Sequence, residues 1–100
     1  MKAEDLRDAV IKAIDSVSVS EKLVSIGIDF TKYSNFCTVS VNFHSRNTSV
    51  SYGFDFGTVE RTTLWKENKR IVTNLSREQA LEELKAKFEE LGGIFDANNI

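Results

Sequence analysis

Apolar residues near the N-terminus recur at spacings of three and four, the period of a helix that buries one stripe of its surface. This pattern predicts an amphipathic helix from Ala3 to Val17, with the charged residues on the opposite face. The segment SVSVSEK that follows breaks the helical period. The apolar stripe consists of Leu6, Ala9, Val10, Ala13, Ile14 and Val17.

A second helical pattern precedes the C-terminus. Ser76 and Gln79 have the spacing of a capping box, so this helix is predicted to begin directly after Ser76. Gly92 and Gly93 predict its end, because glycine readily adopts the backbone conformation that terminates a helix. The final residues, about 96–100, are polar and are expected to fray. The apolar stripe consists of Ala80, Leu81, Leu84, Phe88 and Leu91.

Between the two helical patterns, apolar and polar residues alternate strictly over residues 24–30, 37–43 and 50–56. Such alternation predicts strands with one face on a core and the other face outside it. The linkers KYSN and HSRNTS have the length and composition of hairpin connections, which predicts an antiparallel meander. The predicted core face consists of Val24, Ile26, Ile28, Phe30, Val39, Val41, Phe43, Tyr52, Phe54 and Phe56.

The next segment is less regular, and we expect a further hairpin with strands at residues 58–65 and 70–73 and a turn at KENK. The whole pattern predicts an α+β fold. Its antiparallel sheet has four or five strands, and the N- and C-terminal helices pack on one face of that sheet as a two-layer sandwich. One hundred residues without proline or a low-complexity linker predict a single domain, residues 1–100.

Two of the predicted strands repeat almost the same line, VSIGIDF at residues 24–30 and VSYGFDF at residues 50–56. No second helix-plus-strand unit follows the repeat, which favours a shared structural solution over a duplication. If Phe30 pairs with Cys37, every apolar residue stays on one face, as it does when Phe43 pairs with Val50. The predicted cross-strand rows on the other face are Gly27–Ser40–Gly53, Asp29–Thr38–Asp55 and Ser25–Asn42–Ser51.

Glycine inside a strand gives no side chain to pack and commonly marks the close approach of another group. The predicted row of two glycines and a serine is therefore a shallow trough. Its occupant is Trp65 of the same chain, a second copy of the protein or a foreign partner. We expect this sheet face to bind a protein. The predicted binding residues are Gly27, Asp29, Thr38, Ser40, Asn42, Ser51, Gly53 and Asp55.

No residue pattern indicates catalysis, a metal site or a cofactor. Asp29 and Asp55 are predicted to lie about 10 Å apart, one on each side of the middle strand, which is too far to chelate one small cation. His44 has no histidine or cysteine at metal-ligand spacing and is expected at the surface of a hairpin. Cys37 is in phase with the apolar residues, which predicts a buried small side chain. We expect neither an enzyme nor a cofactor.

The segment RTTLWKENKR, residues 61–70, carries four basic residues against a single acid and contains the only tryptophan. Basic residues interleaved with an aromatic side chain can bind single-stranded nucleic acid through phosphate contacts and base stacking. Charged hairpin tips also commonly serve to block edge-to-edge aggregation. The alternative function is a small nucleic-acid-binding module. Its predicted binding residues are Arg61, Trp65, Lys66, Lys69 and Arg70.

The net charge of −2 gives no long-range attraction for nucleic acid or an anionic membrane. No apolar run has the length of a membrane span, the N-terminal residues lack the apolar stretch of a secretory signal, and a single cysteine suits a reducing compartment. We therefore expect a small non-catalytic cytoplasmic binding protein of the inhibitor, immunity or adaptor type, bacterial or phage in origin. Its expected partner is a protein of unknown identity or a second copy of itself.

Overall fold

The computed structural model describes residues 2–18, 23–57, 61–66 and 71–97. Over these residues the chain forms one helix, five strands and a second helix, which confirms the predicted α+β order. The helices are α1 (Ala3–Ser16) and α2 (Arg77–Glu90). The strands are β1 (Leu23–Lys32), β2 (Phe36–Ser45), β3 (Ser49–Gly57), β4 (Thr62–Lys66) and β5 (Ile71–Asn74).

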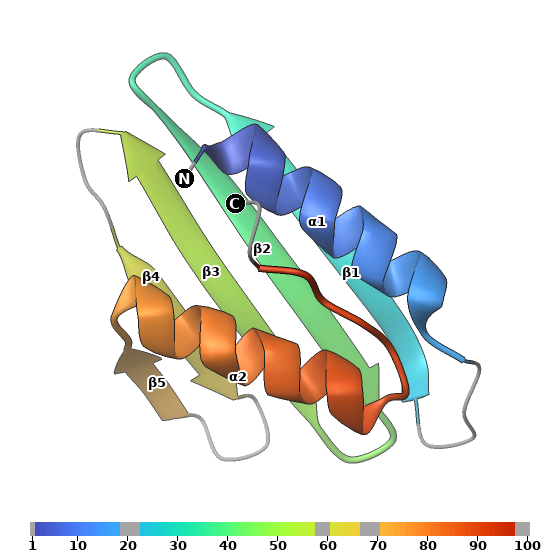
Figure 1. Cartoon of the computed structure of the whole chain (residues 1–100). Helices are drawn as coiled ribbons and strands as arrows, with labels where there is room; N and C mark the ends of the chain where they lie inside the picture. The colour runs from blue at the N-terminus through green and yellow to red at the C-terminus, as the bar shows by residue number, and fades with distance from the viewer. Residues whose placement is uncertain (1, 19–22, 58–60, 67–70, 98–100) are drawn as a thin grey trace.

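The five strands form one antiparallel sheet in the order β1-β2-β3-β4-β5, so each strand pairs with its neighbours along the chain. Both helices lie on the same face of this sheet, α1 over β1 and β2, and α2 over β3 and β4 (Figure 1). We call the helix-covered side the inner face and the opposite side the outer face. The predicted β4–β5 hairpin is confirmed, although residues 58–60 and 67–70 of the predicted segment lie outside the described residues.

The second helix begins and ends as its sequence predicts. Ser76 Oγ accepts a hydrogen bond from the Gln79 N–H at 3.2 Å, and Gln79 Oε1 accepts one from the Ser76 N–H at 3.1 Å, so two backbone donors of the first turn are satisfied. Gly92 follows the helix with φ of +77°, a conformation in which glycine has no steric penalty.

The core lies between the inner face and the two helices. Phe54 of β3, Phe88 of α2 and Leu6 of α1 are completely buried. The Phe88 ring meets the Phe43 ring edge to face, with centroids 5.2 Å apart, and stacks on the Phe95 ring at 5.8 Å. These aromatic contacts tie α2 both to the sheet and to the chain that follows the helix.

The chain after α2 runs back between the two helices (Figure 1). Phe95 is 2% exposed, and Ala97 packs against the core. The order of this segment therefore extends into the range predicted to fray, because Phe95 supplies apolar surface that only the core can bury. Residues 98–100 lie outside the described part of the chain.

The predicted register of the second hairpin is confirmed and that of the first is wrong. Phe43 pairs with Val50, whereas Phe30 pairs with Val39 and not with Cys37. The strand β1 continues to Lys32, and a tight turn follows in which the Tyr33 N–H donates to the Phe36 carbonyl at 2.8 Å. The rings of these two residues stack at 4.5 Å. A shift of two residues keeps every side chain on its own face, so alternation alone does not distinguish the two registers.

Apolar side chains of β1 are less buried than those of the inner strands. Ile26, Ile28 and Phe30 pack against the core but are only partly buried, and Cys37 is likewise half-buried instead of fully buried as predicted. The side chain of Val24 lies outside the described part of the structure. The remaining residues of the predicted core face, from Val39 to Phe56, are buried.

Candidate binding face of the sheet

The corrected register rearranges the predicted rows on the outer face. Gly27 lies opposite Asn42, and Asp29 lies opposite Ser40, so the two glycines stand in different rows. All three predicted rows are therefore wrong at β1. Gly27 does not lie opposite Ser40, Asp29 does not lie opposite Thr38, and Ser25 lies opposite His44 and not Asn42. The rows observed are Gly27–Asn42–Ser51–Trp65–Val72, Asp29–Ser40–Gly53–Thr63–Asn74 and Thr31–Thr38–Asp55.

The two glycines do not form a filled trough. A Cβ atom added at Gly27 would meet no described atom within 4 Å. At Gly53 it would make two ordinary contacts at 3.9 Å, with Ser40 Oγ and the Thr63 carbonyl oxygen. Trp65 therefore covers neither position, and both glycines are open on the outer face.

A chain of hydrogen bonds crosses three strands of this face. Ser51 Oγ donates to Asn42 Oδ1 at 2.7 Å, and Asn42 Nδ2 donates to Asp29 Oδ2 at 3.0 Å. These hydrogen bonds run diagonally across the strands, because Asp29 stands in the row next to that of Asn42. These contacts hold three of the predicted binding residues in one arrangement before any partner arrives. His44 lies exposed at the rim, as predicted, with Nδ1 2.8 Å from Ser49 Oγ.

An apolar patch lies beside this polar network. Trp65 of β4 and Val72 of β5 are direct cross-strand partners, and they are 36% and 59% exposed. Trp65 also pairs with Ser51, the first donor of the hydrogen-bond chain. The sequence predicted Trp65 in the nucleic-acid segment or over the glycines, and Val72 was not predicted at the surface. The alternation of side chains in the β4–β5 hairpin could have identified this pair, because it puts Trp65 and Val72 on the face opposite to that of buried Leu64.

The predicted nucleic-acid site is divided between the two faces of the sheet. Lys66 pairs with Val50, a residue of the core, so Lys66 and Trp65 leave the strand in opposite directions. Arg61 is exposed directly before β4, where its carbonyl oxygen accepts the Asp55 N–H at 2.8 Å. Lys69 and Arg70 lie outside the described residues.

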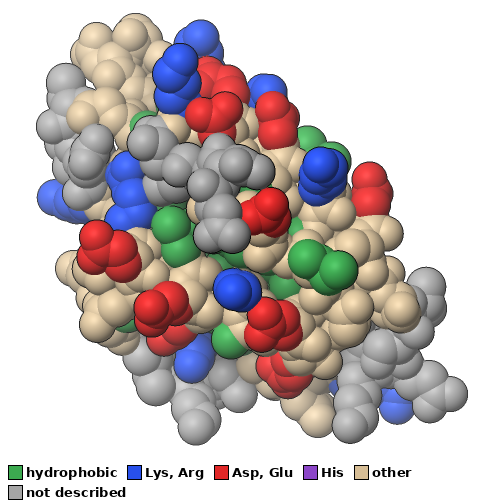
Figure 2. Space-filling model, viewed as in Figure 1, with side chains coloured by type: hydrophobic (Ala, Val, Ile, Leu, Met, Phe, Trp, Pro, Cys, Tyr) green, Lys and Arg blue, Asp and Glu red, His purple; other side chains and the backbone are tan. Residues whose placement is uncertain are grey.

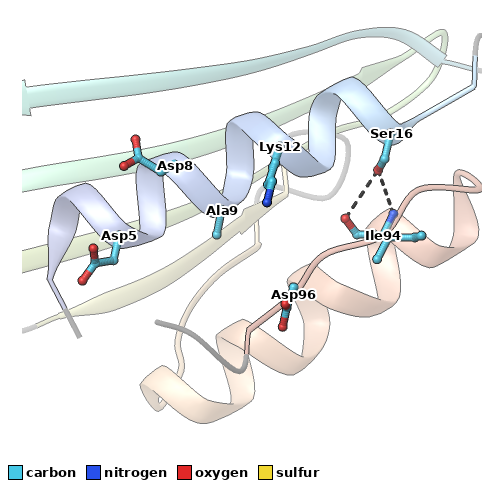
Figure 3. Close-up of a pocket in the computed structure, with 7 residues that line it drawn as sticks. All are labelled: Asp5, Asp8, Ala9, Lys12, Ser16, Ile94 and Asp96. Carbon is cyan, nitrogen blue, oxygen red and sulfur yellow. Dashed lines mark hydrogen bonds between the residues drawn. The ribbon is translucent and has the colours of Figure 1, made fainter.

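A shallow groove on the helix side, between α1 and the chain after α2, is lined by several ionisable side chains (Figure 3). Asp5, Asp8 and Lys12 of α1 and Asp96 after α2 are spread along it without converging on one point. Ser16 Oγ accepts the Ile94 N–H at 2.8 Å and fixes the end of the groove. Figure 2 shows acidic and basic side chains scattered over both helices around this groove. The groove thus reflects how the chain after α2 docks on α1.

Within the described residues, histidine, cysteine and carboxylate side chains gather nowhere in the groups of three that would hold a metal ion. Among the described residues, Tyr52 on the inner face has a strongly raised pKa. Burial, with a smaller contribution from the negative charges of Glu83 and Glu90, raises the pKa of Tyr52 from 10.0 to about 12. This shift follows from the packing of Tyr52 in the core.

Neither described helix is long and apolar enough to cross a membrane. No protein-family model, curated protein or solved structure matches the chain significantly.

Proposed function

We propose that this chain is a small non-catalytic binding protein that contacts a foreign protein through its outer face. The observation that carries the proposal is the exposed pair Trp65 and Val72 beside the ordered chain Ser51–Asn42–Asp29, on a face that neither helix covers. The proposed contact surface keeps the eight predicted binding residues and adds Trp65, Val72 and Thr63.

The composition of this surface supports the proposal of a protein interface. Stable interfaces combine a desolvated apolar or aromatic centre with a polar rim, and tryptophan is among the residues that contribute most to binding. Side chains that are already held by hydrogen bonds lose little further freedom on binding, which lowers the entropic cost of association. The expected partner presents an apolar side chain to Trp65 and Val72, and hydrogen-bond donors to Asp29 and Asp55.

The nucleic-acid alternative has less support. On the outer face, the carboxylates of Asp29 and Asp55 accompany Trp65, and Lys66 points to the inner side. Binding to a phosphate backbone requires a concentration of positive charge around the stacking residue. A protein surface needs no such concentration.

The proposal includes a cytoplasmic location and a role of the inhibitor, immunity or adaptor type. A half-buried free thiol at Cys37 is compatible with a reducing compartment. A protein that acts only by surface complementarity blocks or bridges its partner without chemistry of its own.

The test compares three forms of the chain immobilised as bait in an extract of its source organism. These are the wild type, Trp65→Ala/Val72→Ser on the outer face and Ile11→Ser as the matched control, since Ile11 is an apolar residue 43% exposed on the helix side. The protein held by the wild type is purified and titrated against each form. We expect Ile11→Ser to bind like the wild type, and the double variant to bind at least about tenfold more weakly.

Equal affinity of the partner for all three folded forms would contradict the proposal. Retention of nucleic acid that is lost in high salt would support the alternative function instead. Circular dichroism of each form shows that lost binding does not come from lost folding.

A further inference from the structure

The two edges of the sheet differ in length and protection. The outermost strands of the described sheet are β5, with four residues, and β1, with ten. A short edge strand presents few unpaired backbone groups, which is one way in which proteins prevent unwanted pairing. The edge of β1 presents a long row of them, and no described strand pairs with it.

The central part of β1 lacks the usual protective devices. Its pairing with β2 is irregular only between Leu23 and Ser25, and its lysine, Lys32, stands at the last position. From Ser25 to Thr31 the pairing is continuous, and Asp29 is the single charge. Such an edge accepts another extended backbone through main-chain hydrogen bonds.

The inner-face side chains of β1 are also incompletely buried. Ile26, Ile28 and Phe30 are only partly buried, whereas Val39, Val41 and Phe43 on the neighbouring β2 are buried. A strand added at the edge of β1 would bring apolar side chains against these three residues. The edge therefore fits an extended segment with the same alternation, and β1 itself is such a segment.

We propose that β1 pairs antiparallel with β1 of a second copy of this chain, with Ile28 opposite Ile28 of the second copy. The two sheets then form one continuous sheet around a twofold axis. In this register the inner face of one copy continues into the inner face of the other, and every residue from Ser25 to Thr31 is paired. It places Ile26 opposite Phe30 of the second copy, and Gly27 opposite Asp29 of the second copy.

The two neighbouring registers that keep the faces matched are worse. Centring the pair on Asp29 sets two carboxylates opposite each other, which is destabilising. Centring it on Gly27 keeps only Ser25 to Asp29 clear of the irregular end of β1.

The side chains of Gly27 and Asp29 suit the proposed pairing. A Cβ at Gly27 would meet no described atom within 4 Å, so this position has room for a side chain from the other copy. The Asp29 carboxylate accepts Asn42 Nδ2 at 3.0 Å and is therefore drawn toward β2, away from the open edge. The single charge of the central stretch thus offers little obstruction to a second strand.

The test measures dimerisation of the full chain by sedimentation velocity over a wide concentration range. It compares two variants that introduce opposite charges at Gly27. Gly27→Asp puts a second carboxylate opposite Asp29 of the other copy, and this occurs twice in the dimer, so the dimer dissociation constant should rise about tenfold or more. Gly27→Lys puts an ammonium there, and the dissociation constant should stay equal or fall. Gly53→Asp, on the outer face of β3, controls for added charge away from the edge and should leave it unchanged.

A wild type that stays monomeric at all concentrations would overturn the proposal, and so would equal effects of the two Gly27 variants. Loss of the dimer in Gly53→Asp alone would assign self-association to the outer face.

Disulfide cross-linking tests the same register if Gly27→Asp does not fold. In a Cys37→Ala background, Ser25→Cys/Thr31→Cys should give disulfide-linked dimers on mild oxidation, and Ser25→Cys/Asp29→Cys should not. The reverse result would overturn the register.

Discussion

The segments VSIGIDF and VSYGFDF carry the same alternation in two places of one sheet, the first in the edge strand β1 and the second in the central strand β3. In β3, Tyr52, Phe54 and Phe56 are at most 8% exposed. The equivalent residues of β1, Ile26, Ile28 and Phe30, are only partly buried. The central copy has strands on both sides and α2 above it, while the edge copy has one strand and α1. Burial is thus decided by neighbours in the sheet, because the same pattern leaves different amounts of surface in water.

The two copies share one tertiary feature that their sequences do not contain. The Arg7 guanidinium of α1 lies 4.8 Å from the centre of the Phe30 ring, and that of Arg77 at the start of α2 lies 4.5 Å from the centre of the Phe56 ring. Arg77 Nη2 also donates to the Asp55 carbonyl oxygen at 3.0 Å. Each helix therefore places an arginine over the last phenylalanine of one copy, and the central copy has the additional hydrogen bond.

The largest expected difference between the copies is at their fifth position. Phe54→Ala should lower the free energy of unfolding by about 3–5 kcal/mol, because it empties a completely buried site. Ile28→Ala should cost roughly 1–2 kcal/mol, because a side chain already partly in water loses less on truncation. Urea unfolding of both variants measures the two values. Equal losses would contradict the inference that a strand's position in the sheet sets how much its side chains stabilise the fold.

A smaller difference is expected at the arginines that cover the rings. Arg77→Met should lower the free energy of unfolding by about 1–2 kcal/mol, since it removes a cation–π contact and a hydrogen bond to a backbone carbonyl. Arg7→Met, which removes the contact with Phe30, should cost about 0.5 kcal/mol. Methionine keeps most of the apolar stem in both cases. A larger loss for Arg7→Met in urea unfolding would reverse the ranking of the two copies.

The last expected difference lies at the third position of the central copy and appears only at high pH. Because the folded protein raises the pKa of Tyr52 from 10.0 to about 12, the neutral phenol is favoured in the fold. Its contribution is complete below pH 10 and decreases as the pH rises toward 12, since the unfolded chain ionises first. At pH 11 the wild type should have lost roughly 1 kcal/mol that Tyr52→Phe does not lose.

The Tyr52 measurement is a difference between two urea-unfolding series, wild type and Tyr52→Phe, from pH 9 to pH 11. Other groups ionise in this range in both proteins and cancel in the comparison. Parallel pH dependence of the two series would show that Tyr52 ionises equally well in the folded and unfolded chain.

Much of the fold follows from local features of the sequence. The stripe from Leu6 to Val17 and the capping box at Ser76 define two helices, because helix periodicity and capping depend on residues within a few positions of each other. The alternation in three segments assigns each strand residue to a face for the same reason. The short linker HSRNTS also predicts the second hairpin correctly, including the pairing of Phe43 with Val50.

What the sequence did not decide are the quantities that depend on distant neighbours. The register of the first hairpin shifts by two residues without moving any side chain to the other face, so the tight turn at Tyr33–Phe36 decides it and thereby separates Gly27 from Gly53. The meeting of Trp65 with Val72 beside Ser51 required the register of β4 and β5. The partial burial of Ile28 required the strand order of the sheet, and the burial of Phe95 required the placement of the helices. Alternation fixes the direction of a side chain, whereas its partners are set by pairing and packing, whose free energy depends on residues far apart in the chain.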